Sequence, residues 1–154
     1  MLRSIFILLT LVLVPNMSDA QQRVVDVIVS TPWSRATPAS AQVAGGYVEI
    51  RNAGYSPDRL VGATVEVAGR VEIHEMSVVD GVMRMRPLPN GLIIPGGRTV
   101  TLAPGGYHFM FMELRRPLAQ GERIKGTLIF ERSGSIDVQF DVGGLGSAGP
   151  PHGR

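Results

Sequence analysis

Alternation of apolar and polar residues dominates this chain, and it predicts strands rather than helices. Side chains point alternately to the two faces of a strand, so a half-buried sheet carries an apolar residue at every second position. We find no long stretch with an apolar helical stripe and helix caps. The pattern predicts strands over residues 23–30, 43–52, 58–67, 70–77, 82–87, 99–102, 107–114, 123–131 and 136–142.

The segments between these strands are rich in turn residues. They include Asn52-Ala53-Gly54, Asp80-Gly81, Asn90-Gly91, Gly96-Gly97 and Gly105-Gly106. Short strands at regular spacing, separated by such turns, predict an antiparallel β-sandwich or barrel. With no internal repeat and no sign of a second domain, we expect one folded domain over residues 21–142.

The two ends of the chain differ from this domain. Residues 1–20 carry Arg3, an apolar run over 5–14 and small residues before Ala20, which is typical of a signal peptide cleaved near Ala20. The alternative is a membrane anchor, but the run is too short to span a bilayer. We therefore expect a periplasmic protein. Residues 143–154 contain little apolar surface and are expected to form a mobile tail with a solvated His152.

Composition excludes several partners and chemistries. The net charge is only +2, Lys125 is the single lysine and the arginines are scattered, so a nucleic-acid partner is not expected. The chain contains no cysteine, which excludes disulfides and thiolate metal ligands. We expect a monomer without a membrane span after signal cleavage.

One predicted hairpin gathers metal-binding side chains on one face. Asp80-Gly81 favours a two-residue type I′ turn, which would place Met76 opposite Met85. Directly paired residues share a face of the sheet. The residues expected on that face are His74, Met76, Val78, Met83 and Met85.

The segment 107–112 offers a second set of such side chains. The aromatic residues at positions 107, 109 and 111 belong in the core because of their size. Their neighbours His108, Met110 and Met112 then lie on the other face, where we expect them to meet the hairpin. His108 and Met110 are two apart on one strand, about 7 Å along the backbone, and can reach one ion.

Imidazole and thioether groups together indicate copper, and Cu(I) above all. Cu(I) is a soft ion that accepts sulfur and nitrogen ligands, whereas hard cations do not select thioethers. Methionine is also a common core residue, so Met76 and Met112 taken singly are interpreted as packing residues. The clustering favours metal, because every methionine after the predicted signal peptide lies within residues 76–112.

The chain also resembles the PCu(A)C-type periplasmic copper chaperones over most of the predicted domain. The resemblance rests on Trp33–Pro38, Gly45–Asn52, His74-Glu75-Met76, Gly81–Pro87, Ile94–Gly97 and Leu102–Met110. It implies a cupredoxin-like Greek-key β-sandwich with His74, Met85, His108 and Met110 as Cu(I) ligands. It also implies delivery of copper to the binuclear copper site of cytochrome c oxidase, or to its assembly factors. Many members carry a His- and Met-rich tail associated with Cu(II), where this chain has only His152.

We therefore expect a carrier and not an enzyme. Blue-copper electron transfer usually needs a cysteine ligand, and neither Gly-x-Ser-x-Gly nor His-Glu-x-x-His occurs. Two alternatives stay open: copper buffering or resistance without a dedicated acceptor, and a ligand-binding or adhesive sandwich that needs no metal. We hypothesise that the thioethers of Met76, Met83 and Met112 surround the ligands, keep water away from the ion and offer a path for ligand exchange. Arg84 and Arg86, on the opposite face from Met83, are solvated residues or a docking patch for an acidic partner.

Overall fold

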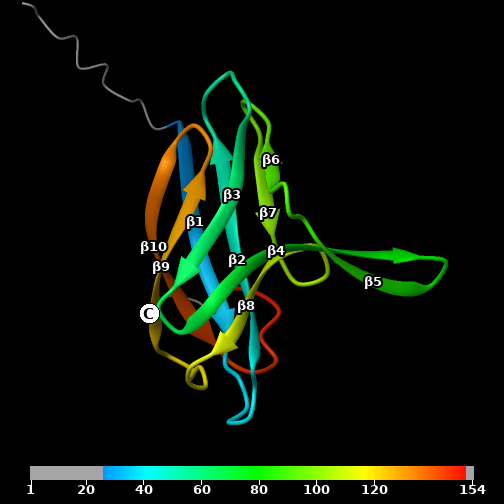
Figure 1. Ribbon diagram of the computed structural model, residues 1–154, viewed down its shortest axis with the longest axis vertical. Coiled ribbons are helices and arrows are strands. Elements are labelled where there is room, and N and C mark those ends of the chain that lie inside the picture. The colour runs from blue at the N-terminus through cyan, green and yellow to red at the C-terminus, as the bar shows by residue number, and fades with distance from the viewer. Residues whose placement is uncertain (1–25, 152–154) are drawn as a thin grey trace, which may run out of the picture.

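Strands are the only regular elements in the computed structural model, which describes residues 26–151 (Figure 1). The strands are β1 (Val27–Arg35), β2 (Val43–Asn52), β3 (Asp58–Val65), β4 (Ala68–Val79), β5 (Val82–Pro87), β6 (Leu92–Ile94), β7 (Thr99–Leu102), β8 (Tyr107–Leu114), β9 (Arg123–Phe130) and β10 (Gly134–Gly143). The predicted all-β class is confirmed. The predicted signal peptide over residues 1–20 and His152 lie outside the described residues.

The strands pair in the order β5-β4-β8-β2-β1-β10-β9-β3-β6, and β7 pairs with β2. Strands distant in sequence are neighbours, because β2 pairs with β8 and β1 pairs with β10. Every pair is antiparallel except β1 with β10, where Trp33 lies opposite Asp141 in a parallel arrangement. The described sheet is thus antiparallel, as predicted, apart from this one pair.

The sheet folds over on itself to form a sandwich around an aromatic core. Phe109 and Phe111 of β8 are fully buried, and so is Phe140 of β10. In the pairing order, β2 and β1 separate β8 from β10, yet the Phe111 and Phe140 rings meet edge to face with centroids 5.3 Å apart. Such an arrangement adds to the stabilisation from apolar burial. The core thereby fixes the inner face of β8 and leaves its other face free for a site.

The strand at the start of the domain departs from the sequence-based boundaries. The alternation stops at Ser30, where the prediction ended, but β1 continues to Arg35. Thr31 has a positive φ of 46°, and the register with β2 shifts between Ser30 and Trp33. Such an irregularity breaks the period-2 pattern without ending the strand.

A short strand was also missed. β6 contains three residues, is followed by Pro95, and pairs with the start of β3. Three residues are too few for alternation to be recognised.

The β4–β5 hairpin projects from the sandwich as an arm (Figure 1). Asp80 and Gly81 have positive φ values of 52° and 75°, as the predicted type I′ turn requires. The predicted register is also confirmed, with Met76 opposite Met85 and Val79 opposite Val82.

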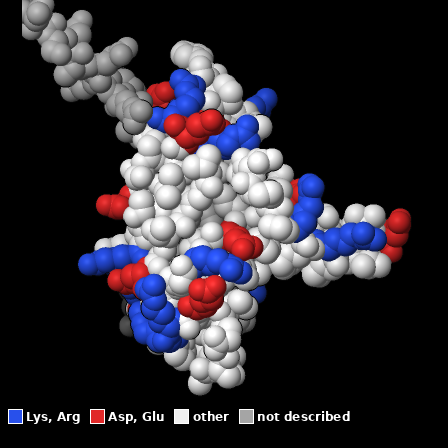
Figure 2. Space-filling view, in the orientation of Figure 1, with Lys and Arg blue, Asp and Glu red and all other residues white. Residues whose placement is uncertain are grey.

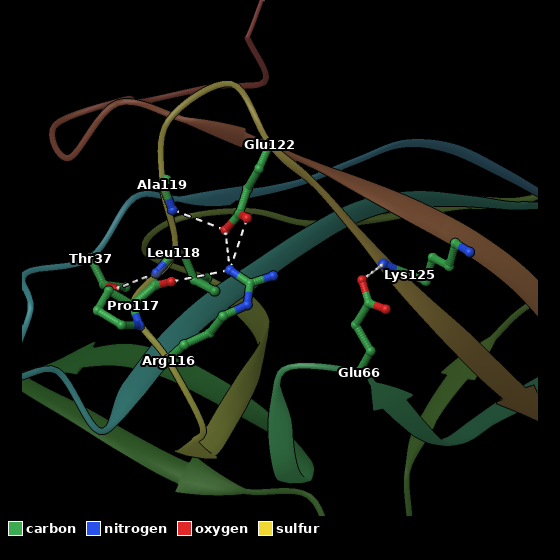
Figure 3. A network of polar contacts seen from close by, with 8 residues as sticks. All are labelled: Thr37, Glu66, Arg116, Pro117, Leu118, Ala119, Glu122 and Lys125. Carbon is green, nitrogen blue, oxygen red and sulfur yellow. Dashed lines mark hydrogen bonds and ion pairs between the residues drawn. The ribbon is translucent and has the colours of Figure 1, made fainter.

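The connection from β8 to β9 is fastened by polar contacts (Figure 3). Arg116 donates from Nη1 to both carboxylate oxygens of Glu122, at 2.9 and 2.8 Å. The same carboxylate accepts the backbone N–H of Ala119 at 2.9 Å, and the backbone N–H of Leu118 donates to the Thr37 hydroxyl at 3.0 Å. Burial raises the pKa of Glu122, but its hydrogen bonds with Arg116 and Ala119 outweigh burial, and the net shift of the pKa is downward. This network holds the far end of β8 in place.

The chain after β10 lies against the end of β1. Arg35 donates from Nε to the Ser147 carbonyl at 2.6 Å, and the Ala36 N–H donates to the Gly143 carbonyl at 2.8 Å. The boundary at residue 142 and the mobility of 143–154 stay predictions. Within the described range, no helix has the length and apolar character needed to cross a membrane.

Candidate metal centre

The pairing of β4 with β8 sets the two described histidines side by side. His74 is the direct partner of His108 across the two strands. Their ring centroids are 5.7 Å apart and the ring planes are inclined by 54°. The pairing of the two strands therefore brings two histidines that are distant in sequence next to each other.

A cleft of about 270 Å³ opens beside this pair. Its lining residues are Arg35, Val43, Ala44, Gly45, Tyr47, Met76, Met85, Pro104, Gly105, His108 and Met110. Three of the four expected ligands, Met85, His108 and Met110, therefore share one cleft. His74 does not line the cleft itself but lies next to His108.

The methionines that periodicity could not tell apart occupy different places. Met85 lines the cleft, whereas Met83 is 66% exposed on the arm and does not. Met112 lies beside Arg70, whose Nη2 is 3.4 Å from the thioether sulfur. Met76 is half-buried and lines the cleft opposite Met85. The interpretation of Met76 and Met112 as core residues is wrong, since neither belongs to the buried apolar cluster.

The His74 ring is held so that one nitrogen has no partner. Its side chain is 12% exposed, and Nε2 donates to a carboxylate oxygen of Glu72 at 2.8 Å. Nδ1 is buried and makes no hydrogen bond within the described part of the chain. A carboxylate accepts and never donates, so the bond places the proton of the neutral ring on Nε2. The lone pair of Nδ1 is left available for a ligand.

His108 presents the opposite ring nitrogen. Its Nδ1 lies 3.0 Å from the Gly106 carbonyl, which can only accept, so the neutral ring carries its proton on Nδ1. The lone pair is therefore on Nε2. Hydrogen bonds of this kind fix the tautomer and orientation of metal-binding histidines. The two rings are set by different acceptors to offer one nitrogen each.

Glu72 was missed by the sequence analysis, although it lies two residues before His74 on the same face of β4. The hydrogen bond from His74 lowers the pKa of Glu72, burial opposes this shift, and the positive charge of Arg70 adds to it. Arg70 Nε is 3.3 Å from the other carboxylate oxygen. Spacing of two on a strand was the available signal, since it places a carboxylate beside the imidazole.

The donor set fits a soft ion. Within residues 26–151, no group of three or more His, Cys, Asp or Glu side chains could hold a metal ion. Among the described residues, Arg35 is the only charged one that lines the cleft, and none of them offers a carboxylate there. Imidazole nitrogens and thioether sulfurs suit Cu(I), whereas calcium and magnesium need oxygen ligands. The residues present therefore fit copper in its monovalent state.

Comparison with known proteins gives the family and the fold of this chain. The model of a family described as "Putative lipoprotein LpqE-like" matches residues 27–142. A relative from Leifsonia xyli subsp. xyli (strain CTCB07), "Putative lipoprotein Lxx21020", is 35% identical over 114 residues, covering 74% of this chain and 68% of the relative.

Two solved structures share the sandwich. The apo PCuAC domain from PmoF1 superposes with a TM-score of 0.65 at 28% identity, covering 77% of this chain and 94% of that domain. The solution structure of CuI-DR1885 from Deinococcus radiodurans gives 0.63 at 28% identity, covering 81% and 83%. The expected likeness to PCu(A)C-type domains is thus found in three dimensions.

Proposed function

Because this chain belongs to the LpqE-like family and has the fold of PCuAC domains, we propose that it is an exported Cu(I) carrier. Its ligands in this proposal are His74, Met85, His108 and Met110. The ion is cargo that is received and passed on, and no reaction is catalysed.

A single observation carries the proposal. Among residues 26–151, His74 Nδ1 is buried without a hydrogen-bond partner beside His108, next to a cleft that Met85 and Met110 line. A buried polar atom without a partner costs free energy, so its persistence is explained if a ligand satisfies it. The similar DR1885 protein was solved in its Cu(I) form, which supports this choice of ion.

The exposure of the ligands indicates an order of transfer. Met85 is 46% exposed on the projecting arm, while His108 is only 5% exposed. An incoming ligand from an acceptor can displace Met85 first, and His108 is released last. Neutral thioethers need no deprotonation, so the ion can leave Met85 without a proton transfer.

The acceptor we propose is the binuclear copper site of cytochrome c oxidase or one of its assembly factors. Copper buffering would use the same ligands without an acceptor. Deletion of the gene separates the two: loss of oxidase activity at low copper supports delivery, and sensitivity to excess copper supports buffering.

The ligand set is tested by anaerobic Cu(I) titration against a competing chelator, with X-ray absorption to count neighbours. We expect one ion per chain with nitrogen and sulfur neighbours in equal number. His74→Ala, Met85→Ala, His108→Ala and Met110→Ala should each weaken binding by more than about 100-fold, beyond the usual effect of losing an outer hydrogen-bond partner. Met83→Ala is the matched control, because Met83 lies outside the cleft. Unchanged affinity in all four variants would refute the site.

A further inference from the structure

β5 is an edge strand that no other described part of the chain covers. It stands at the end of the pairing order, and all six of its residues are exposed. The arm that it forms with β4 extends away from the sandwich (Figure 1). Natural proteins normally cover such edges, because the free N–H and C=O groups of an edge strand can pair with another chain. An uncovered edge beside a metal site is therefore a candidate for docking.

The two faces of β5 differ sharply in character. Met83 and Met85 face the same side as His74, since they pair with Val78 and Met76. Arg84 and Arg86 face the other side, and Figure 2 shows basic side chains along the projecting arm. One face of the arm is thus uncharged and rich in thioethers, and the other carries positive charge.

The charge on the second face is only partly neutralised. Arg86 donates from Nε to Glu75, its direct partner on β4, at 2.7 Å. Arg84 lies opposite Ser77 and takes part in no salt bridge within residues 26–151. A strand that paired with the outer edge of β5 would place side chains directly beside Arg84, where a carboxylate would be favoured.

We propose that β5 docks an extended segment of the copper-accepting partner, in which Met or His residues alternate with Asp or Glu. The inference rests on the proposed function, since it names the partner of the same site. Pairing with β5 puts every second side chain of the segment beside Met83 and Met85, and the intervening ones beside Arg84 and Arg86. The soft side chains of the acceptor then arrive next to Met85, the most exposed of the proposed ligands on the arm.

A second copy of this chain fits the edge poorly. In an antiparallel pair of two β5 strands related by a two-fold axis, like faces lie on the same side. Registers that set Arg84 opposite another arginine would be destabilised by like charges, and the register that sets it opposite Val82 would offer it no carboxylate. The charge pattern therefore selects a partner that carries carboxylates.

The test is an NMR titration of the copper-free protein with the synthetic peptide acetyl-Glu-Met-Glu-His-Glu-Met-Glu-amide. We expect amide shift changes centred on residues 82–86 and slower amide hydrogen exchange in β5, because its free edge becomes paired. Arg84→Glu should lower the affinity for the peptide by about tenfold or more. Arg98→Glu is the matched control: Arg98 is exposed between β6 and β7, away from the arm, and its reversal should leave peptide binding unchanged.

A second peptide with lysine in place of each glutamate should not bind. Equal binding of the lysine peptide, or shifts without slower exchange in β5, would overturn the proposal. Self-association through β5 that grows with protein concentration would also overturn it, in favour of a second copy. Cu(I) titration of the unaltered protein without peptide tests the ligand set separately, so failure of docking is distinguishable from failure of copper binding.

Discussion

Asp58 at the start of β3 and His74 in β4 are two polar side chains with little exposure, and they differ in whether their polar atoms have partners. Asp58 is 5% exposed, and its carboxylate accepts the backbone N–H groups of Arg59, Arg132 and Ser133 at 2.7–2.9 Å. The Ser133 hydroxyl donates a further bond at 2.6 Å. His74 has one ring nitrogen bonded and the other buried, with no partner for it in the part of the chain that the structure describes.

The difference separates a structural group from a binding group. Burial raises the pKa of Asp58, but its four hydrogen bonds outweigh that effect and lower the pKa overall. The carboxylate therefore joins β3 to the turn after β9 and has little capacity left for a ligand. His74 keeps one lone pair free at a cost in stability, which is the arrangement expected where an ion is to bind.

The substitution Asp58→Ala should have the largest effect, and that effect is on stability. Three backbone donors lose their acceptor, and we expect about 3 kcal/mol of lost stability. Denaturant unfolding measures it, and Cu(I) affinity of the folded protein should stay unchanged. Asp137→Ala is the control, since Asp137 is exposed and, among the described residues, accepts a hydrogen bond only from the Thr127 hydroxyl; it should cost less than about 1 kcal/mol. Equal losses in the two variants would remove the contrast.

Glu72→Ala should have the next largest effect, this time on copper. Loss of the acceptor at His74 Nε2 lets the ring change tautomer, and we expect about a tenfold weaker Cu(I) affinity. Glu72→Gln keeps an amide oxygen that can accept the same proton, so it should restore most of the affinity. Nitrogen-15 shifts of the ring in the copper-free protein report the tautomer directly. A ring that keeps its proton on Nε2 in Glu72→Ala would contradict the assigned role.

The fold was largely predictable because most strands have one buried face. The hairpin register followed from Asp80-Gly81 alone, since a two-residue turn leaves one pairing. The extension of β1 was not predictable, because the irregularity at Thr31 breaks the alternation. The parallel pairing of β1 with β10 is set by how the sheet closes, and alternation within a strand carries no information about it.

The site was predictable to the level of a face and no further. Alternation placed the histidines and methionines on one face of their strands, but Met83 and Met85 have the same periodicity. They differ in that Met85 lies near the base of the arm and lines the cleft together with residues of β8, whereas Met83 does not. This difference depends on tertiary structure. The place of Met76 in the cleft wall and the contact of Met112 with Arg70 required side-chain geometry for the same reason.

The acid dependence of stability offers a smaller test of the Asp58 network. Its folded pKa is lowered, so its ionised form contributes stability above the unfolded pKa of about 3.9. That contribution is lost as the pH falls through the lower folded pKa. The difference in unfolding free energy between the natural protein and Asp58→Asn should be constant from neutral pH to about pH 5, and should shrink below about pH 4 by at most about 1.4 kcal/mol per pH unit. A difference that does not change with pH would show that the charge is unimportant.

The smallest effect expected separates Met76 from Met112. Leucine preserves much of the volume of methionine and removes the sulfur, so the variants report the thioether itself. Met112 is in contact with Arg70, whose positive charge repels a cation, and Met112→Leu should leave Cu(I) affinity and transfer rate unchanged. Met76 lines the cleft opposite Met85, and Met76→Leu should slow transfer to a competing chelator by about two- to threefold, an effect below about 1 kcal/mol. Stopped-flow transfer measures both variants. Equal transfer rates for Met76→Leu and the natural protein would limit the role of Met76 to forming the wall of the cleft. A slower transfer rate for Met112→Leu would show that the Met112 thioether takes part in transfer despite its contact with Arg70.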